Sequence, residues 1–146
     1  MKIKSILLSV VVACLFSGCA SVAMAPAEKD TALKQFNEPP KDKAGLYIYR
    51  NTFVGQALKK TVSINDVAIG ETANKVYFYR QIPPGKHTIS TESEFSDNSI
   101  SFVANPGKNY FVEQYIKMGV LVGGAGLRMV EEGAGKRAVS ECKLAL

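Results

Sequence analysis

Residues 60–71 decide the fold, and they read KTVSINDVAIGE. Apolar Val62 and Ile64 alternate with polar neighbours, and this alternation is typical of a strand that buries one face. The pair Asn65-Asp66 suits a tight turn, after which the alternation resumes at Val67. The stretch therefore predicts a β-hairpin.

Short alternating segments recur along the rest of the chain. Turn sequences such as Pro83-Pro84-Gly85 and Asn105-Pro106-Gly107 separate them at intervals of about eight to twelve residues, which is typical of a sandwich or barrel. We expect a mainly β protein, a small antiparallel β-sandwich over residues 44–146. The other expected strands cover residues 46–49, 76–81, 87–91, 100–104 and 110–117, with 127–130 as a further candidate.

The end of the chain allows two interpretations. Residues 131–143 could form a short C-terminal helix, although Gly133 and Gly135 each weaken a helix by about 1 kcal/mol relative to alanine. A loop followed by a terminal strand fits equally well. The preceding glycine-rich stretch contains an apolar loop, Val120-Leu121-Val122, which could insert into a partner protein.

The amino terminus has the layout of a secretory signal helix. Two lysines precede an apolar run from Ile6 to Phe16, which is shorter than the about 20 residues that a membrane-spanning helix needs. The run ends in Ser17-Gly18-Cys19, which resembles the lipobox of bacterial lipoproteins. We therefore predict a signal peptide over residues 1–18, cleavage between Gly18 and Cys19, and acylation of Cys19.

Two other cleavage sites have to be weighed. Cys14 also follows small and aliphatic residues, but cleavage there leaves a short apolar region. Ordinary secretion could cut after Ala25, but Pro26 would then follow the cut, a position that the general signal peptidase tolerates badly. Cys19 remains the favoured site.

Acylation of Cys19 predicts an address in the cell envelope. Each buried methylene group contributes about 0.8 kcal/mol to membrane binding, and the resemblance to lipoproteins implies two or three acyl chains and hence a stable anchor. Residue 20 is alanine rather than the aspartate that commonly retains lipoproteins at the inner membrane, so we expect the periplasmic face of the outer membrane. Without Lys2 and Lys4 the mature chain has 16 Lys+Arg against 13 Asp+Glu, a balance too small to indicate nucleic-acid binding.

Residues 19–43 are expected to form a polar tether between anchor and domain. Ala27 to Phe36 is compatible with a short docking helix, which Pro39-Pro40 would terminate. With Cys19 acylated, Cys142 has no partner for an internal disulfide, so the core alone must stabilise the fold. If Cys19 is not acylated, a Cys19–Cys142 disulfide becomes possible.

Several blocks carry a family resemblance. Residues 62–70 and 82–89 look like β modules of the PEGA type, which implies a transthyretin-like sandwich topology. A wider set of motifs resembles the bacterial lipoprotein family catalogued as domain of unknown function 2846. These motifs are Lys34-Gln35-Phe36, Leu46-Tyr47-Ile48-Tyr49-Arg50, Phe53-Val54-Gly55, the turn at Asn65, Pro84-Gly85-Lys86-His87 and Gly107-Lys108-Asn109-Tyr110-Phe111. They are mainly turn and core residues, so the resemblance implies a fold rather than a substrate.

Each candidate catalytic or ligand-binding motif lacks a residue or a spacing that its chemistry needs. His87 is the only histidine, and no motif ties it to a nucleophile such as Cys142. Glu92, Glu94 and Asp97 lack the spacing of a calcium-binding loop. Gly133-Ala134-Gly135-Lys136 imitates the end of a phosphate-binding loop, but its first glycine and its Ser or Thr are missing. We expect no catalytic residue, no metal and no cofactor.

A binding surface is the remaining functional candidate. If Tyr47, Tyr49, Tyr77 and Tyr79 point outward, they form an exposed tyrosine face beside Arg50 that could bind an envelope protein or peptidoglycan. Cross-strand pairing on a solvated sheet explains the same pattern, and Arg50, the cation that ends the first strand, could cap or pair rather than bind. The sequence thus favours a non-enzymatic, membrane-anchored envelope lipoprotein that binds or scaffolds another component. The alternative is a periplasmic small-ligand carrier or enzyme with a pocket near His87.

Overall fold

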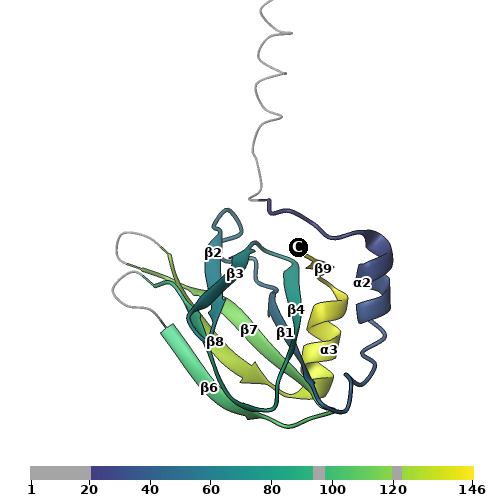
Figure 1. Ribbon diagram of the computed structural model, residues 1–146. Helices are drawn as coiled ribbons and strands as arrows, with labels where there is room; N and C mark the ends of the chain where they lie inside the picture. Colours follow the sequence, from purple (N-terminus) through teal and green to yellow (C-terminus); the bar gives the residue numbers. More distant parts are fainter. Residues whose placement is uncertain (1–20, 94–97, 120–122) are drawn as a thin grey trace, which may run out of the picture.

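The computed structural model describes residues 21–93, 98–119 and 123–146. Two β-sheets pack face to face, and helices α2 and α3 cover the outer face of one of them (Figure 1). The predicted class, a mainly β protein with a small β-sandwich, is therefore confirmed. The predicted signal peptide and lipobox, with Gly18 and Cys19, lie outside the described residues.

The smaller sheet is antiparallel throughout and contains the predicted hairpin. Its order is β3-β2-β5-β6. Asn65 and Asp66 have positive φ angles of 49° and 66°, as a two-residue hairpin turn of the primed type requires. The strands are β2 (Lys60–Ile64), β3 (Val67–Thr72), β5 (Gly85–Thr91) and β6 (Asn98–Ala104).

The larger sheet is mixed, with the order β8-β7-β1-β4-β9. Strand β1 pairs in parallel with β7, and β4 pairs in parallel with β9, so the expectation of a purely antiparallel sandwich is wrong for this sheet. Between β4 and β7 the chain forms two strands of the smaller sheet. It then returns to the larger sheet, where β7 runs in the same direction as β1. Its strands are β1 (Ala44–Arg50), β4 (Val76–Ile82), β7 (Asn109–Lys117), β8 (Gly124–Val130) and β9 (Lys143–Leu144).

The main core lies between the two sheets, where alternate residues of each strand meet. Full burial of such an aliphatic side chain contributes about 1.5–3 kcal/mol relative to exposure. The same period of two that identifies the strands therefore also selects the core. Its buried members include Leu46, Ile48, Val62, Ile89 and Val112.

Both helices pack on the larger sheet. Helix α2 (Ala27–Leu33) confirms the predicted docking helix, and α3 (Glu132–Ser140) decides between the two C-terminal interpretations in favour of a helix, although β9 follows it. The Glu131 side chain caps α3 by accepting hydrogen bonds from the N–H groups of Gly133 and Ala134. None of the described helices has the length and apolar character needed to cross a membrane.

The described part of the predicted tether is packed rather than extended. Ala25 donates its backbone N–H to Leu144 O at 2.9 Å, and Leu146 donates to Ala23 O at 3.0 Å. The two ends of the described chain therefore pair at the edge of the larger sheet. The tether prediction is wrong for this segment, because its small residues add to a sheet edge and its helix covers a sheet face.

Candidate functional site

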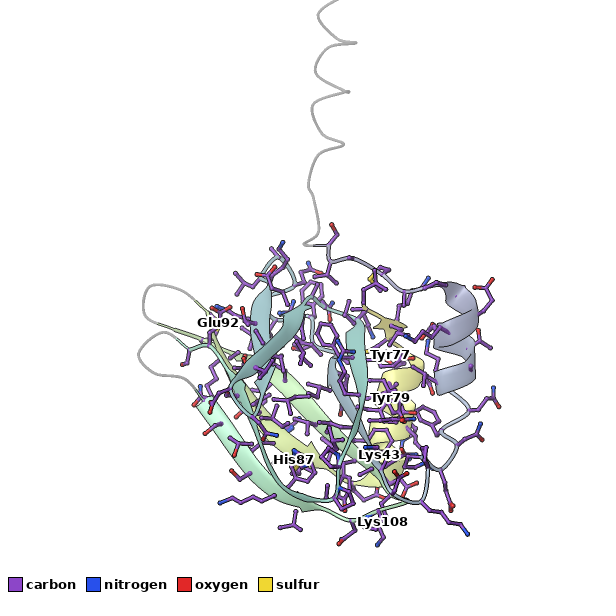
Figure 2. All side chains as sticks on the ribbon, in the orientation of Figure 1. Lys43, Tyr77, Tyr79, His87, Glu92 and Lys108 are labelled. Carbon is purple, nitrogen blue, oxygen red and sulfur yellow. The ribbon has the colours of Figure 1, made fainter. Side chains whose placement is uncertain are left out.

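The predicted tyrosine surface is buried. Tyr47 lies opposite Tyr79, and Tyr49 lies opposite Tyr77, on the outer face of the larger sheet. Helices α2 and α3 cover this face, so Tyr47, Tyr49 and Tyr77 are at most 3% exposed and only Tyr79 is half-buried. Figure 2 shows Tyr77 and Tyr79 on the side of the sheet where the helices lie. The prediction of an exposed tyrosine face is therefore wrong.

The buried tyrosines form a second core with satisfied hydroxyl groups. The Tyr47 ring stacks on Phe111 with centroids 5.0 Å apart. Its hydroxyl donates to Leu33 O at 2.9 Å, and the Tyr77 hydroxyl donates to Asp30 Oδ1 at 2.8 Å, both in α2. Burial raises the pKa of Tyr47 and Tyr77 well above their usual range. These tyrosines thus attach α2 to the sheet rather than bind a ligand.

Arg50 points into the sandwich and is fully buried. Its Nη2 donates to Leu58 O at 2.5 Å, while Nε and Nη1 have no hydrogen-bond partner among the described residues. Burial lowers the pKa of Arg50 to about 10. The guanidinium therefore holds the loop after β1 in place, and the prediction that Arg50 belongs to an exposed binding surface is wrong.

A buried polar network joins the two sheets near this end of the sandwich. The Gln114 side chain in β7 donates from Nε2 to Thr91 Oγ1 at 2.7 Å, and its Oε1 accepts from the Thr72 hydroxyl. Thr91 in turn donates to Thr61 O at 2.8 Å. These polar atoms satisfy one another, so the network stabilises the sandwich without leaving a free reactive group.

His87 has a structural position in β5 and is 5% exposed. Its Nε2 lies 2.7 Å from Pro83 O, and its Nδ1 lies 2.9 Å from Asn65 Nδ2. The partners imply a neutral ring in which Nε2 donates to the carbonyl and Nδ1 accepts from the amide. Both nitrogens are thus engaged in holding turns, and neither is placed to act as a base.

Cys142 and His87 lie in different layers of the molecule. Cys142 follows α3 and packs with Tyr49 and Tyr77 on the outer face of the larger sheet, whereas His87 contacts Phe102 in the smaller sheet. Burial raises the pKa of the Cys142 thiol to about 12. The structure therefore excludes a Cys142–His87 dyad, and the buried thiol stays protonated at neutral pH.

The remaining sequence candidates have no ligand geometry where the structure describes them. Glu131 occupies the N-terminus of α3, the place where a phosphate would bind, with the N–H groups of Gly133 and Ala134 already paired. Residues 21–93, 98–119 and 123–146 contain no group of three or more His, Cys, Asp or Glu side chains that could hold a metal ion. Glu94, Asp97 and the Val120-Leu121-Val122 loop fall outside these ranges.

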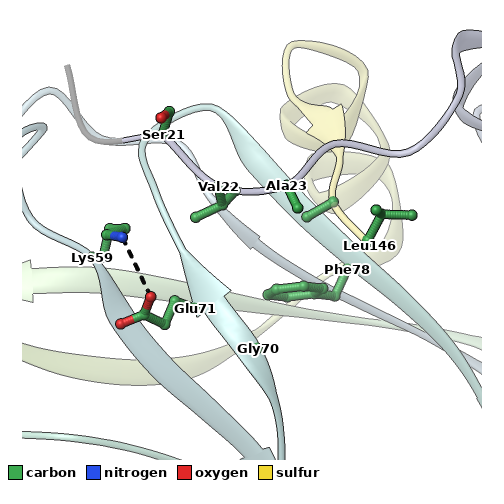
Figure 3. A pocket seen from close by; sticks show the side chains of 9 residues that line it. Ser21, Val22, Ala23, Lys59, Gly70, Glu71, Phe78 and Leu146 are labelled. Carbon is green, nitrogen blue, oxygen red and sulfur yellow. Dashed lines mark ion pairs between the residues drawn. The ribbon is translucent and has the colours of Figure 1, made fainter. Parts of the chain in front are cut away.

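An open groove of about 500 Å³ lies where the described chain begins (Figure 3). Ser21, Val22 and Leu146 form one wall, and an ion pair between Lys59 Nζ and Glu71 Oε2, 3.5 Å apart, forms the opposite rim. The groove combines an apolar wall with a charged rim, so it suits an amphipathic segment better than a small reactive substrate.

The floor of this groove is the Phe78 ring, which packs on Gly70. A Cβ at residue 70 would lie 2.8 Å from Phe78 Cζ, so only glycine allows this approach. The Arg80 guanidinium lies 5.5 Å from the Phe78 ring centroid. Sequence reasoning missed this site, although an isolated glycine within a predicted hairpin signals that another group approaches the backbone closely.

Known sequences place the chain in a family. The sequence model described as Protein of unknown function (DUF2846) matches residues 40–125, which run from the residues before β1 into β8. A protein of Haemophilus influenzae, described as an uncharacterized protein, is 51% identical over 135 residues, which cover 92% of this chain and 80% of the relative. The matched segment includes the hairpin, the Pro84-Gly85 turn and β7, whereas the motif Lys34-Gln35-Phe36 lies before it. The chain therefore belongs to the DUF2846 family.

Proposed function

We propose that this chain is the precursor of a lipid-anchored envelope lipoprotein, cleaved before Cys19 and held in the membrane by acyl chains at that cysteine. The observation that carries the proposal is the sequence Ser17-Gly18-Cys19 at the end of a short apolar run. The start of the packed domain supports it. Val22, three residues after Cys19, already packs against the cluster formed by Ala73 and Phe78.

The proposed address is the periplasmic face of the outer membrane, because Ala20 follows the acylated cysteine. The domain then lies directly on the membrane surface, since packed residues begin almost immediately after the anchor. This arrangement differs from a domain carried on a long flexible linker. It limits the partners to molecules that reach the membrane surface.

Acylation is tested by labelling growing cells with radioactive palmitate. The wild-type chain is expected to take up the label, and the Cys19→Ala variant is expected to lose it completely and to keep its signal peptide. Cys142→Ser is the matched control, because it removes the other cysteine of the mature chain and should leave labelling unchanged. Equal labelling of wild type and Cys19→Ala would falsify the anchor.

We propose a binding or scaffolding role rather than catalysis. The support is that His87 has both ring nitrogens in structural hydrogen bonds and that Cys142 is buried in another layer. The groove beside Ser21 is the surface best suited to a partner, such as an envelope protein or peptidoglycan. The alternative, a carrier or enzyme with a pocket near His87, has less support because the imidazole is enclosed.

The partner can be sought by lysine-directed cross-linking in intact envelopes followed by mass spectrometry. Lys59 lies at the rim of the groove, whereas exposed Lys86 lies at the other end of the smaller sheet. A protein that cross-links through Lys59 in preference to Lys86 supports the groove as the binding surface. Links through Lys86 alone would place the binding surface elsewhere.

A further inference from the structure

Large apolar side chains are exposed on two loops at one end of the sandwich. Phe53 is 80% exposed and Val54 is 47% exposed in the loop between β1 and β2, and Met118, after β7, is 87% exposed. Such side chains usually lie in a core, so a group of them on loop tips indicates contact with an apolar environment.

These loop tips belong to one surface. Val54 and Met118 line the same hollow of about 330 Å³, together with Gly55, Leu58 and Ile116. The surface is fixed from within, because Arg50 donates to Leu58 O at the base of the loop. We call Phe53, Val54 and Met118 the apolar tips.

The apolar tips lie at the end of the molecule where the chain enters the domain. Leu58 lines the hollow of the tips, and the next residue, Lys59, lines the groove together with Ser21 (Figure 3). Ser21 follows Cys19 by two residues, a distance of at most about 7 Å along an extended chain. An acyl anchor at Cys19 would therefore bring this end of the domain to the membrane.

Two exposed valines at the opposite end of the sandwich provide a comparison with the apolar tips. Val67 follows the hairpin turn and Val103 pairs with Lys86 beside the Pro84-Gly85 turn, and these two valines are 66% and 62% exposed. Strand β2 runs from Lys60, next to the groove, toward this turn, so both valines lie away from the anchor. They are exposed apolar side chains that a membrane at the anchor end cannot reach.

We propose that the apolar tips insert into the interfacial region of the same phospholipid bilayer that holds the acyl chains, and so fix the orientation of the domain on the membrane. This inference rests on the proposed function, because the anchor at Cys19 brings the tips to the lipid. Apolar side chains at loop tips bind bilayer interfaces by transferring apolar surface out of water, and a nearby lipid anchor strengthens this binding by keeping the tips at the surface. The domain then stands on the membrane with its hairpin turn pointing away.

The test uses tryptophan fluorescence, because the chain contains no tryptophan. Phe53→Trp places a single reporter in the tips, and Val103→Trp places a matched reporter at the far end; both positions are exposed, so neither substitution disturbs the core. The full mature chain is coupled through Cys19 to maleimide lipids in phosphatidylethanolamine–phosphatidylglycerol vesicles. Cys142 is 1% exposed and does not compete for the maleimide.

The expected result is a blue shift of the Phe53→Trp emission and quenching by lipids brominated on their acyl chains, with neither effect in Val103→Trp. Equal emission from both variants, or quenching of both, would overturn the inference. Protection of Phe53→Trp from acrylamide without lipid quenching would mean that a second copy of the chain covers the tips, which also overturns it. Because the anchor is attached chemically, these outcomes are independent of the palmitate labelling that tests the proposed function.

Discussion

At the scale of single residues, His87 is the position where a catalytic and a structural interpretation differ most. Its ring connects the Pro83 carbonyl to the Asn65 side chain, and Asn65 Oδ1 accepts from Thr88 N at 2.9 Å. Asn65 N also donates to Thr88 O at 2.8 Å. The imidazole is thus one member of a hydrogen-bonded unit that joins the hairpin turn to β5.

The variant His87→Ala is expected to lower the free energy of unfolding by about 1–3 kcal/mol, because it leaves the Pro83 carbonyl and the Asn65 amide without partners. Urea denaturation followed by circular dichroism measures the change. The exposed neighbour Lys86 is the control, and Lys86→Ala should change stability by less than about 0.5 kcal/mol. An unchanged stability in His87→Ala, combined with a loss of envelope function, would contradict the structural role.

At the scale of elements, alternation identified most strands but not how they pair. The hairpin from β2 to β3 follows from local turn chemistry, because Asn65-Asp66 fixes its register. The parallel pairing of β1 with β7 depends on contacts between residues far apart in sequence, and β9 has only two residues, too few to show a period. Local patterns cannot contain either feature.

The same limit explains why the candidate site was misplaced. Alternation correctly put Tyr47 and Tyr77 on one face of the sheet, but it cannot say whether a helix covers that face. Gly135 was the one local indication that a helix covers this face, but from the sequence alone it only weakened the predicted helix. A Cβ at residue 135 would lie 2.3 Å from Phe111 Cγ, so the glycine is there because the helix lies directly on the sheet.

The two glycines of α3 should therefore respond in opposite ways to alanine. Gly135→Ala gains about 1 kcal/mol of helix propensity but forces a methyl group into Phe111, which costs about 1–3 kcal/mol, so it should lower the melting temperature. Gly133→Ala meets only the ends of two flexible side chains, the Glu131 carboxylate at 3.2 Å and Arg137 Nη1 at 3.6 Å, and should be neutral or stabilising by up to about 1 kcal/mol. Calorimetry on the pair measures both effects, and stabilisation by Gly135→Ala would show that α3 does not lie against β7.

At the scale of the whole molecule, the fold has three layers, and the core between the larger sheet and the helices, here called the outer core, contains ionisable groups. Burial raises the pKa of Tyr49 to about 12 and that of Cys142 to about 12, and it raises the pKa of Tyr47 and Tyr77 as well. Arg50 behaves in the opposite way, since burial lowers its pKa to about 10. The four raised pKa values therefore make the folded state more stable at neutral pH than at alkaline pH. The lowered pKa of Arg50 has the opposite effect.

Because the four raised pKa values outweigh the one lowered pKa, the protein is expected to lose stability at alkaline pH. The unfolded chain loses its thiol and phenol protons near pH 9 and 10, whereas the folded chain keeps them to about pH 12, so stability present at neutral pH is lost across that window. Each such group lowers the free energy of unfolding by about 1.4 kcal/mol per pH unit, and Arg50 cancels about one of the four. Tyr49→Phe keeps the buried ring and removes one ionisable group, so its stability should fall less steeply above pH 10 than that of the wild type. Urea denaturation over this pH range measures both slopes, and identical slopes would mean that water reaches Tyr49 and that the helices do not seal the outer core.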